Sequence, residues 1–300
     1  MASGGRTAQS LGWLFGPFVA LAHLPSPAQA DESRPALWEI RDADTTVYLF
    51  GSIHALPSGV SWWSQPLDEA FSSSDDLMVE TISPTQMSAD WSKSVASIAF
   101  APNLPPLMER IPAEKRPALR AALARNKLPE AAANRMKSWF ASMMVGGAIG
   151  GVTGATAANG VEAVMIAKAK AAHKAVQQFE TPAQQLEIFN QLPEAAQREL
   201  LVQALDDPAT MKVKFDRMIG GWAAGDLDVI WKVTRQGTAS SPALREAMIT
   251  NRDRMLSQWL EGRMAKPGTS FAVLGAAYLA GPDSVIDRLK SRGLRVTRIQ

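Results

Sequence analysis

Short runs rich in apolar and other strand-forming residues predict β-strands near both ends of the chain, with one more in the middle. The predicted strands span residues 37–41, 45–53, 77–82, 175–179, 270–274 and 294–299. The first two runs are separated by Asp42-Ala43-Asp44, and a short polar connection of this kind is typical of a hairpin.

Helical patterns dominate the region between these strands, from about residue 102 to residue 261. Thr181 and Gln184 form a capping box, which predicts the start of a helix. A further helix is predicted over 282–291, and Gly293 is its stop signal. The sequence therefore predicts an α+β fold, whose sheet is built from N- and C-terminal strands and whose middle is largely helical.

The first thirty residues have the pattern of a secretory signal peptide. Arg6 precedes an apolar run over 11–24, and Ala28-Gln29-Ala30 has the small residues of a cleavage site. The apolar run is short for a membrane span. We therefore expect a signal peptide over 1–30, a single mature domain over 31–300, and a periplasmic or secreted protein.

Charge and composition exclude several classes of function. The chain carries 31 basic and 29 acidic residues, so no positive footprint for nucleic acid exists. Cysteine is absent, which excludes thiolate metal sites and a cysteine nucleophile. Residues 140–161 carry no charge but are rich in Gly, Ala, Thr and Asn, so we expect no integral membrane span in the mature chain.

A glycine followed three residues later by a polar ring occurs after two of the apolar runs. One copy is Gly51-Ser52-Ile53-His54, and the other is Gly275-Ala276-Ala277-Tyr278. A glycine at a strand end lets the backbone turn where a Cβ would clash, so both rings are predicted to face a shared site. Two interpretations of His54 stay open: a metal ligand or general base, or a loop histidine satisfied by backbone carbonyls.

Three charged residues are further candidates for the site. Glu80 and Glu180 each follow an apolar strand, where a carboxylate needs water, a partner or a metal ion; Glu180 also suits a helix N-terminus. Arg252 falls on a predicted apolar helix face, where it either pairs with an anionic group or extends its charged end into water. The apolar residues of that face are Leu244, Met248, Met255 and Trp259.

The mature chain resembles the TraB/PrgY/GumN family, which also includes the Tiki metalloproteases. The resemblance rests on motifs in a fixed order rather than on any single motif. They are Leu37-Trp38, Phe50-Gly51-Ser52-Ile53-His54, Val79-Glu80, Gly160-Val161-Glu162, Phe179-Glu180-Thr181 with Gln184-Gln185-Leu186, Trp222 before Gly225-Asp226-Leu227, Asn251-Arg252-Asp253-Arg254-Met255, and residues 275–283.

The resemblance implies an erythromycin-esterase-like fold and, in Tiki-like members, a divalent-metal hydrolase site built from two Gly-x-x-His motifs and an acidic residue. His54 and Glu80 match that set as metal ligands, with Mn²⁺ or a similar ion as the cofactor. Arg252 and Glu180 match family positions of catalytic or structural importance. The second motif departs from the pattern, because Tyr278 stands where the family has histidine.

Two functions stay open from the sequence. The first is an exported metal-dependent hydrolase of the peptidase type, with His54, Glu80, Arg252 and Tyr278 as catalytic residues. The alternative is a non-catalytic envelope protein that binds a peptide or a saccharide in the same cleft. The sequence leaves the oligomeric state open.

Overall fold

The computed structural model describes residues 33–82, 88–146, 149–238 and 241–300. The predicted signal peptide lies outside the described residues, so it stays a prediction. The single mature domain likewise stays a prediction.

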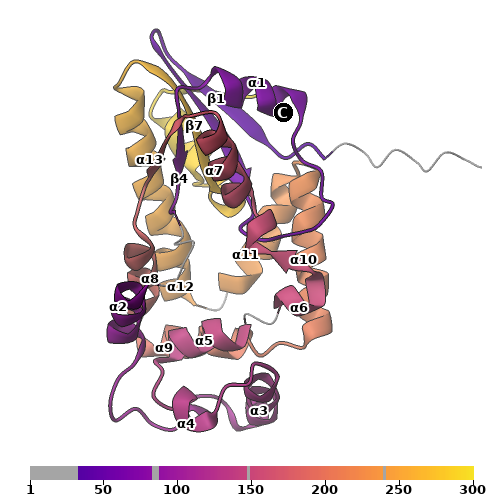
Figure 1. The fold of residues 1–300 in the computed structure, drawn as a ribbon, viewed down its shortest axis with the longest axis vertical. Coiled ribbons are helices and arrows are strands. Elements are labelled where there is room, and N and C mark those ends of the chain that lie inside the picture. Colours follow the sequence, from indigo (N-terminus) through magenta and orange to yellow (C-terminus); the bar gives the residue numbers. More distant parts are fainter. Residues whose placement is uncertain (1–32, 83–87, 147–148, 239–240) are drawn as a thin grey trace, which may run out of the picture. The chain divides into compact units, whose positions relative to one another are not determined.

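One mixed sheet joins strands from the two ends of the chain and from its middle (Figure 1). Its order is β6-β4-β7-β2-β1-β8. The strands are β1 (Leu37–Arg41), β2 (Thr45–Ser52), β4 (Asp76–Val79), β6 (Ala175–Gln178), β7 (Gly268–Gly275) and β8 (Arg295–Arg298). The predicted hairpin is confirmed, because β1 pairs antiparallel with β2. The predicted α+β class, with a sheet from N- and C-terminal strands, is confirmed as well.

Four neighbouring strands run parallel, and their common direction places the candidate site at one edge of the sheet. β6, β4, β7 and β2 are paired in parallel, so their carboxyl ends meet at one edge of the sheet. In the register, Ser52 lies opposite Gly275, and Val79 lies opposite both Val273 and Gln178. Ligands of open α/β sheets bind outside the carboxyl ends of parallel strands, so this edge is where a site is expected.

The helices cover the sheet and form the middle of the chain. They are α1 (Gln65–Ser73), α2 (Ala89–Ala99), α3 (Arg116–Arg125), α4 (Glu130–Ala133), α5 (Ser138–Gly146), α6 (Ile149–Thr153), α7 (Val161–Ala171), α8 (Pro182–Asn190), α9 (Glu194–Gln203), α10 (Pro208–Ala223), α11 (Leu227–Thr238), α12 (Pro242–Arg245), α13 (Asn251–Met264) and α14 (Val285–Ser291). A π-helical turn, Glu246–Thr250, joins α12 to α13. The predicted capping box at Thr181 and Gln184 begins α8, and Gly293, at a φ of 85°, follows α14.

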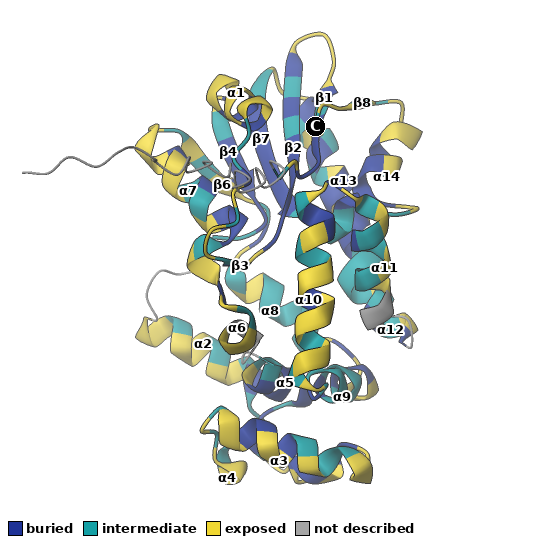
Figure 2. Cartoon of the chain, turned by 90° about the vertical axis from the view of Figure 1, so that its right-hand side faces the viewer, coloured by how far each residue is buried: buried dark blue, intermediate teal, exposed yellow. Residues whose placement is uncertain are grey.

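The inner strands of the sheet are buried on both faces, because their side chains alternate between two apolar clusters (Figure 2). Phe271 and Val273 pack on one side with α1 and α7, whereas Ala272 and Leu274 pack on the other with α13 and α14. Side chains of a strand point alternately to the two faces, so a sheet covered by helices needs apolar residues at every position.

The helical middle has an apolar core of its own. The long uncharged run, residues 140–161, is divided among several elements of this region. A separate apolar cluster joins α3, α5 and α9, with Leu119, Val145 and Leu201 at its centre. The uncharged run is divided among α5, α6 and α7, with a short strand, β5 (Ala155–Thr156), that pairs with β3 (Leu56–Pro57). Among the described residues, no helix has the length and apolarity needed to cross a membrane.

The predicted apolar face around Arg252 is wrong in part. Leu244 is buried, but Met255 is 49% exposed, and the buried face of α13 is formed by Arg252, Asp253 and Leu256. The physical reason is the π-helical turn, whose wider spacing rotates α13 relative to α12.

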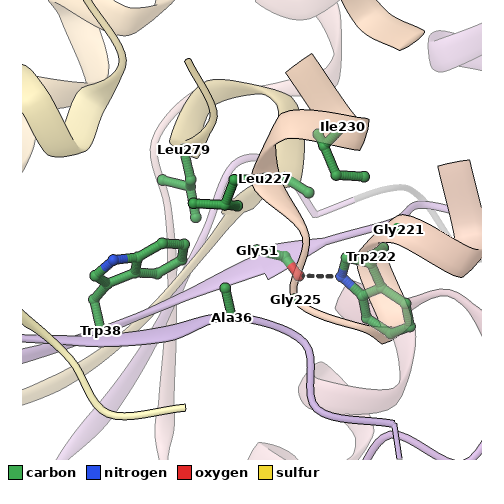
Figure 3. A pocket seen from close by; sticks show the side chains of 10 residues that line it. Ala36, Trp38, Gly51, Gly221, Trp222, Gly225, Leu227, Ile230 and Leu279 are labelled. Carbon is green, nitrogen blue, oxygen red and sulfur yellow. Dashed lines mark hydrogen bonds between the residues drawn. The ribbon is translucent and has the colours of Figure 1, made fainter. Parts of the chain in front are cut away.

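The expected role of Gly51 also needs correction. β2 continues through Gly51 to Ser52, and neither Gly51 nor Gly275 has a positive φ. A Cβ on Gly51 would lie 3.3 Å from Ala276, so this glycine allows close packing rather than a turn. Figure 3 shows the indole of Trp222 donating a hydrogen bond to the Gly51 carbonyl, at 2.7 Å. The apolar cavity beside it has a volume of only about 10 Å³, which leaves no room for a ligand.

The Trp222 hydrogen bond yields a prediction about stability. Trp222→Phe should lower the free energy of unfolding by about 1–3 kcal/mol, because the buried Gly51 carbonyl would lose its donor. Urea denaturation measures the effect. Trp63→Phe is the matched control, since its indole donates to the exposed Asp68 and should cost less than about 1 kcal/mol. Equal losses for the two variants would contradict this role.

Candidate functional site

His54 is paired with a glutamate that the sequence analysis did not select. The chain leaves β2 at Ser52, and the Nδ1 atom of His54 lies 2.9 Å from Oε1 of Glu162. The hydroxyl of Ser52 donates to the same oxygen at 2.6 Å. The carboxylate therefore fixes the orientation of the imidazole and leaves its Nε2 atom for a ligand. We call these two residues the His54–Glu162 dyad.

The dyad joins a solvent-facing imidazole to a buried carboxylate. The His54 side chain is 64% exposed, whereas that of Glu162 is 12% exposed. The hydrogen bond from Glu162, opposed in part by desolvation, raises the pKa of His54 to about 9. Burial alone would raise the pKa of Glu162, but the hydrogen bonds from His54 and Ser52 outweigh it and lower that pKa. At neutral pH the pair is therefore an imidazolium and a carboxylate.

A close backbone contact holds the two partners of the dyad together. Glu162 lies in the first turn of α7, and the N–H of Val161 donates to the Ile53 carbonyl at 3.1 Å. A Cβ on Gly160 would lie 2.0 Å from the backbone oxygen of His54. Only glycine leaves room for this approach, which explains the glycine before α7.

The second group is a buried cluster of two glutamates and one arginine, Glu80, Glu180 and Arg252, which we call the ion cluster. Arg252 donates to Oε2 of Glu180 at 2.5 Å and to Oε2 of Glu80 at 3.1 Å. Its side chain is 3% exposed. Glu80 follows β4, Glu180 follows β6, and Arg252 begins α13, so the cluster ties two strand ends to one helix.

The pKa values within the ion cluster depend on burial and on the contacts between its members and their neighbours. Burial raises the pKa of Glu80, although the Gly275 N–H and the nearby His54 and Arg252 oppose this. Burial alone would lower the pKa of Arg252, but the hydrogen bond to Glu180 and the nearby Tyr278 and Glu80 raise it. The guanidinium stays charged at every pH at which the protein is folded.

Tyr278 lies against the ion cluster. The Arg252 guanidinium is 5.6 Å from the centre of the Tyr278 ring and equally far from that of Phe179. Gly275 donates its N–H to Oε1 of Glu80, and a Cβ there would lie 3.2 Å from both Glu80 and Tyr278. Burial and the Glu80 carboxylate raise the pKa of Tyr278 above its ordinary value. The phenol is therefore neutral and supplies an aromatic face to Arg252.

Two cavities open beside these groups. The first, the His54 cavity, has a volume of about 710 Å³ and is lined by His54, Glu162, Thr81, Gln185 and Lys170, with apolar residues of α7 between them. The second has a volume of about 740 Å³ and is lined by Glu180, Arg252, Phe179, Gln184 and Asn251. The first contains the dyad, so it is the better candidate for chemistry.

The donor atoms here do not fit a divalent metal ion held by His54 and Glu80. Both oxygens of Glu80 already accept hydrogen bonds, one from Gly275 and one from the cationic Arg252. Within the described ranges, no group of three or more His, Cys, Asp or Glu side chains is placed to hold a metal ion. We therefore derive no chemical step through a metal, and the metal of the sequence analysis stays a prediction.

All the predicted residues lie at the carboxyl edge of the sheet, but they divide into two groups. His54 belongs to the dyad, whereas Glu80, Glu180, Arg252, Gly275 and Tyr278 form or surround the ion cluster. Sequence reasoning missed Glu162, Ser52 and Thr81 as site residues. Glu162 could have been found from its place in the first turn of a helix directly after Gly160.

These features define a class of protein: a mixed α/β fold with a histidine–glutamate dyad and a buried ion cluster at the carboxyl ends of parallel strands. Residues 36–298 match the model of the TraB/PrgY/gumN family, and the chain belongs to that family. No curated protein and no solved structure gives a significant match. The erythromycin-esterase-like fold therefore stays a prediction.

Removal of the central cation should destabilise the protein strongly. Arg252→Met would leave Glu80 and Glu180 buried without a cation and should lower the free energy of unfolding by about 3–5 kcal/mol near neutral pH. Thermal and urea denaturation measure this. Arg254→Met is the control, since Arg254 is exposed and pairs with the exposed Glu246.

The loss in Arg252→Met should also depend on pH. Burial already raises the pKa of Glu80, and loss of the Arg252 charge that opposes this raises it further, so the folded state binds more protons than the unfolded state. The stability of the variant is then present at low pH and is lost as pH rises through the folded pKa of Glu80. The loss should be smaller at about pH 5 than at about pH 8. A loss that stays constant over this range would contradict the cluster.

Proposed function

We propose that this chain is a hydrolase that cleaves an amide bond of a peptide-like substrate in the His54 cavity. The observation that carries the proposal is the contact of His54 Nδ1 with Glu162 at 2.9 Å, on an oxygen that Ser52 also holds. A carboxylate that orients an imidazole in this way leaves the other nitrogen as an acid–base group. We propose as well that the protein acts in the periplasm or outside the cell.

The chemistry needs only protein groups and one water molecule. Neutral His54 would take a proton at Nε2 from water, whose oxygen attacks the carbonyl carbon. The resulting imidazolium, stabilised by Glu162, would return that proton to the amine as the C–N bond breaks. The hydroxyl of Thr81 is a candidate donor to the developing oxyanion, because its oxygen is buried in this cavity without a partner among the described residues.

The lining of the cavity supports a substrate with an apolar part and an acidic group. Ala163, Ile166 and Ala167 line it along α7, and Lys170 follows at its end. Lys170 is exposed, and no described residue forms an ion pair with it. Glu162 and Lys170 are eight positions apart in the sequence, which corresponds to about 12 Å along the helix. An acidic side chain a few residues from the cleaved bond would reach this lysine.

A second candidate function is the binding of an anionic ligand without turnover. The raised pKa of His54 favours it, because the imidazolium and Lys170 are both cationic at neutral pH. The two functions predict opposite responses to pH. Binding of an anion would weaken as pH rises through about 9, whereas general-base hydrolysis would accelerate over the same range.

The titration of His54 tests the dyad directly. A proton NMR titration should place the midpoint of His54 at about 9, and Glu162→Gln should move it down towards the ordinary value of about 6.5. An unchanged His54 midpoint in Glu162→Gln would contradict the dyad.

Activity can be tested with a library of fluorogenic peptide amides. The rate should rise tenfold per pH unit and level off near pH 9, and His54→Ala should abolish it. Glu162→Gln should move the plateau to lower pH and reduce its height. An unaltered rate in His54→Ala, or a rate that falls as pH rises towards 9, would refute the hydrolase proposal.

Metal analysis separates this mechanism from the metal-dependent alternative. We expect the purified protein to hold no stoichiometric metal and its activity to withstand a chelator, because Arg252 and Gly275 occupy the Glu80 oxygens. Tyr278→His should raise the metal content, since it adds an imidazole beside Glu80. Stoichiometric metal in the natural protein, with activity lost on chelation, would restore the mechanism implied by the family resemblance.

A further inference from the structure

A smaller cavity lies on a different face of α13 from the ion cluster. Its volume is about 180 Å³, and it is lined from α11, α12, the π-helical turn, α13, the segment before α14 and α14 itself. The lining residues that matter here are Trp231, Arg235, Arg245, Asp253, Asp283 and Arg288. The side chains of consecutive helix residues point about 100° apart. Arg252 therefore belongs to the ion cluster, whereas the next residue, Asp253, lines this cavity. We call it the Asp253 cavity.

Asp253 is the feature that the fold leaves unexplained. It is 4% exposed, and its Oδ1 atom has no hydrogen-bond partner in the described part of the chain. Leaving a buried polar atom without a partner costs about 1–3 kcal/mol. Burial, helped by Asp283 and opposed by Arg288 and Arg252, raises the pKa of Asp253 to about 8. Near neutral pH this carboxyl is therefore mostly protonated and can donate a hydrogen bond.

Part of the cavity wall has an unusual backbone conformation. The π-helical turn, Glu246–Thr250, contributes Ile249 and Thr250, and such turns are frequent at functional sites. Opposite, a Cβ on Gly281 would lie 2.3 Å from the Trp231 indole. The guanidinium of Arg235 is 5.1 Å from the centre of the same ring. Gly281 thus lets the indole pack closely against the backbone, and Arg235 brings a positive charge near the same ring.

The chemistry of the lining selects one class of ligand. Three guanidinium groups outnumber the two carboxyl groups of the lining, and one of those two, Asp253, is mostly protonated near neutral pH. A guanidinium matches the two oxygens of a carboxylate, and an indole offers a flat apolar face. The volume equals that of about six water molecules, which excludes a nucleotide but admits a molecule with one ring.

We propose that the Asp253 cavity binds a small organic carboxylate, whose charged end lies between Asp253 and the arginines and whose apolar part packs on Trp231. The protonated carboxyl of Asp253 donates a hydrogen bond to one oxygen of the ligand, which gives the buried group the partner that it lacks. This site is separate from the His54 cavity and does not depend on the proposed hydrolase.

Calorimetric titration with sodium benzoate tests the site, with benzamide as the neutral probe of the same shape. We expect saturable binding of benzoate at about pH 7, and benzamide at least about tenfold weaker because it lacks the charge. The affinity for benzoate should fall about tenfold per pH unit above about 8, as Asp253 ionises and repels the ligand.

Three variants complete the test. Asp253→Asn keeps a hydrogen-bond donor, so it should bind benzoate with an affinity that no longer changes between pH 7 and pH 9. Arg245→Gln should weaken binding at least about tenfold through loss of the paired charge. Arg292 follows α14 directly and pairs with Glu261 outside the cavity, so Arg292→Gln should bind normally. Absence of saturable heat, equal affinity for benzamide, or an unchanged pH dependence in Asp253→Asn would overturn the proposal.

Discussion

The ion pair between one buried arginine and two buried glutamates is the constraint on which the rest of the structure depends. Arg252 brings the ends of β4 and β6 to the start of α13, and it does so from a position that is 3% exposed. A buried charge is tolerated only when it is fully paired, so the three side chains must stay together. The Gly275 N–H and the Tyr278 ring complete the cluster from β7. The edge of the sheet is thereby held rigid beside the exposed His54.

The ion cluster and the His54–Glu162 dyad lie at the same edge of the sheet, but their charges have different roles. In the ion cluster, burial strengthens the attraction between the opposite charges of Arg252 and the two glutamates, which suits the positioning of the backbone. In the dyad, only Glu162 is buried, and the imidazole that it orients faces solvent, where it can exchange protons with a ligand. A solvent-facing base on a buried anchor combines fixed geometry with access, as general acid–base chemistry requires.

Tyr278 shows how one residue changes the chemistry that the fold can support. Its ring lies on the Arg252 guanidinium, and the phenol is neutral, so it stabilises the cation instead of competing with it for the Glu80 carboxylate. A histidine at this position would add a metal donor next to Glu80. The tyrosine favours a site held by hydrogen bonds and ion pairs, in which His54 and Glu162 perform the proton transfer that we propose.

The sequence by itself determined the strands, the hairpin at Asp42–Asp44, the capping box at Thr181, and the charged residues Glu80 and Glu180 that follow two of the strands. These depend on local periodicity and turn chemistry, which neighbouring residues reveal. Only the tertiary structure decided that Glu162, more than a hundred residues from His54, is its partner, and that Arg252 joins Glu80 to Glu180. It also decided the exposure of Met255, because a π-helical turn changes the phase of a helix without a clear signal in composition. Contacts of this kind arise from the packing of parallel strand ends, and that packing depends on the whole chain at once.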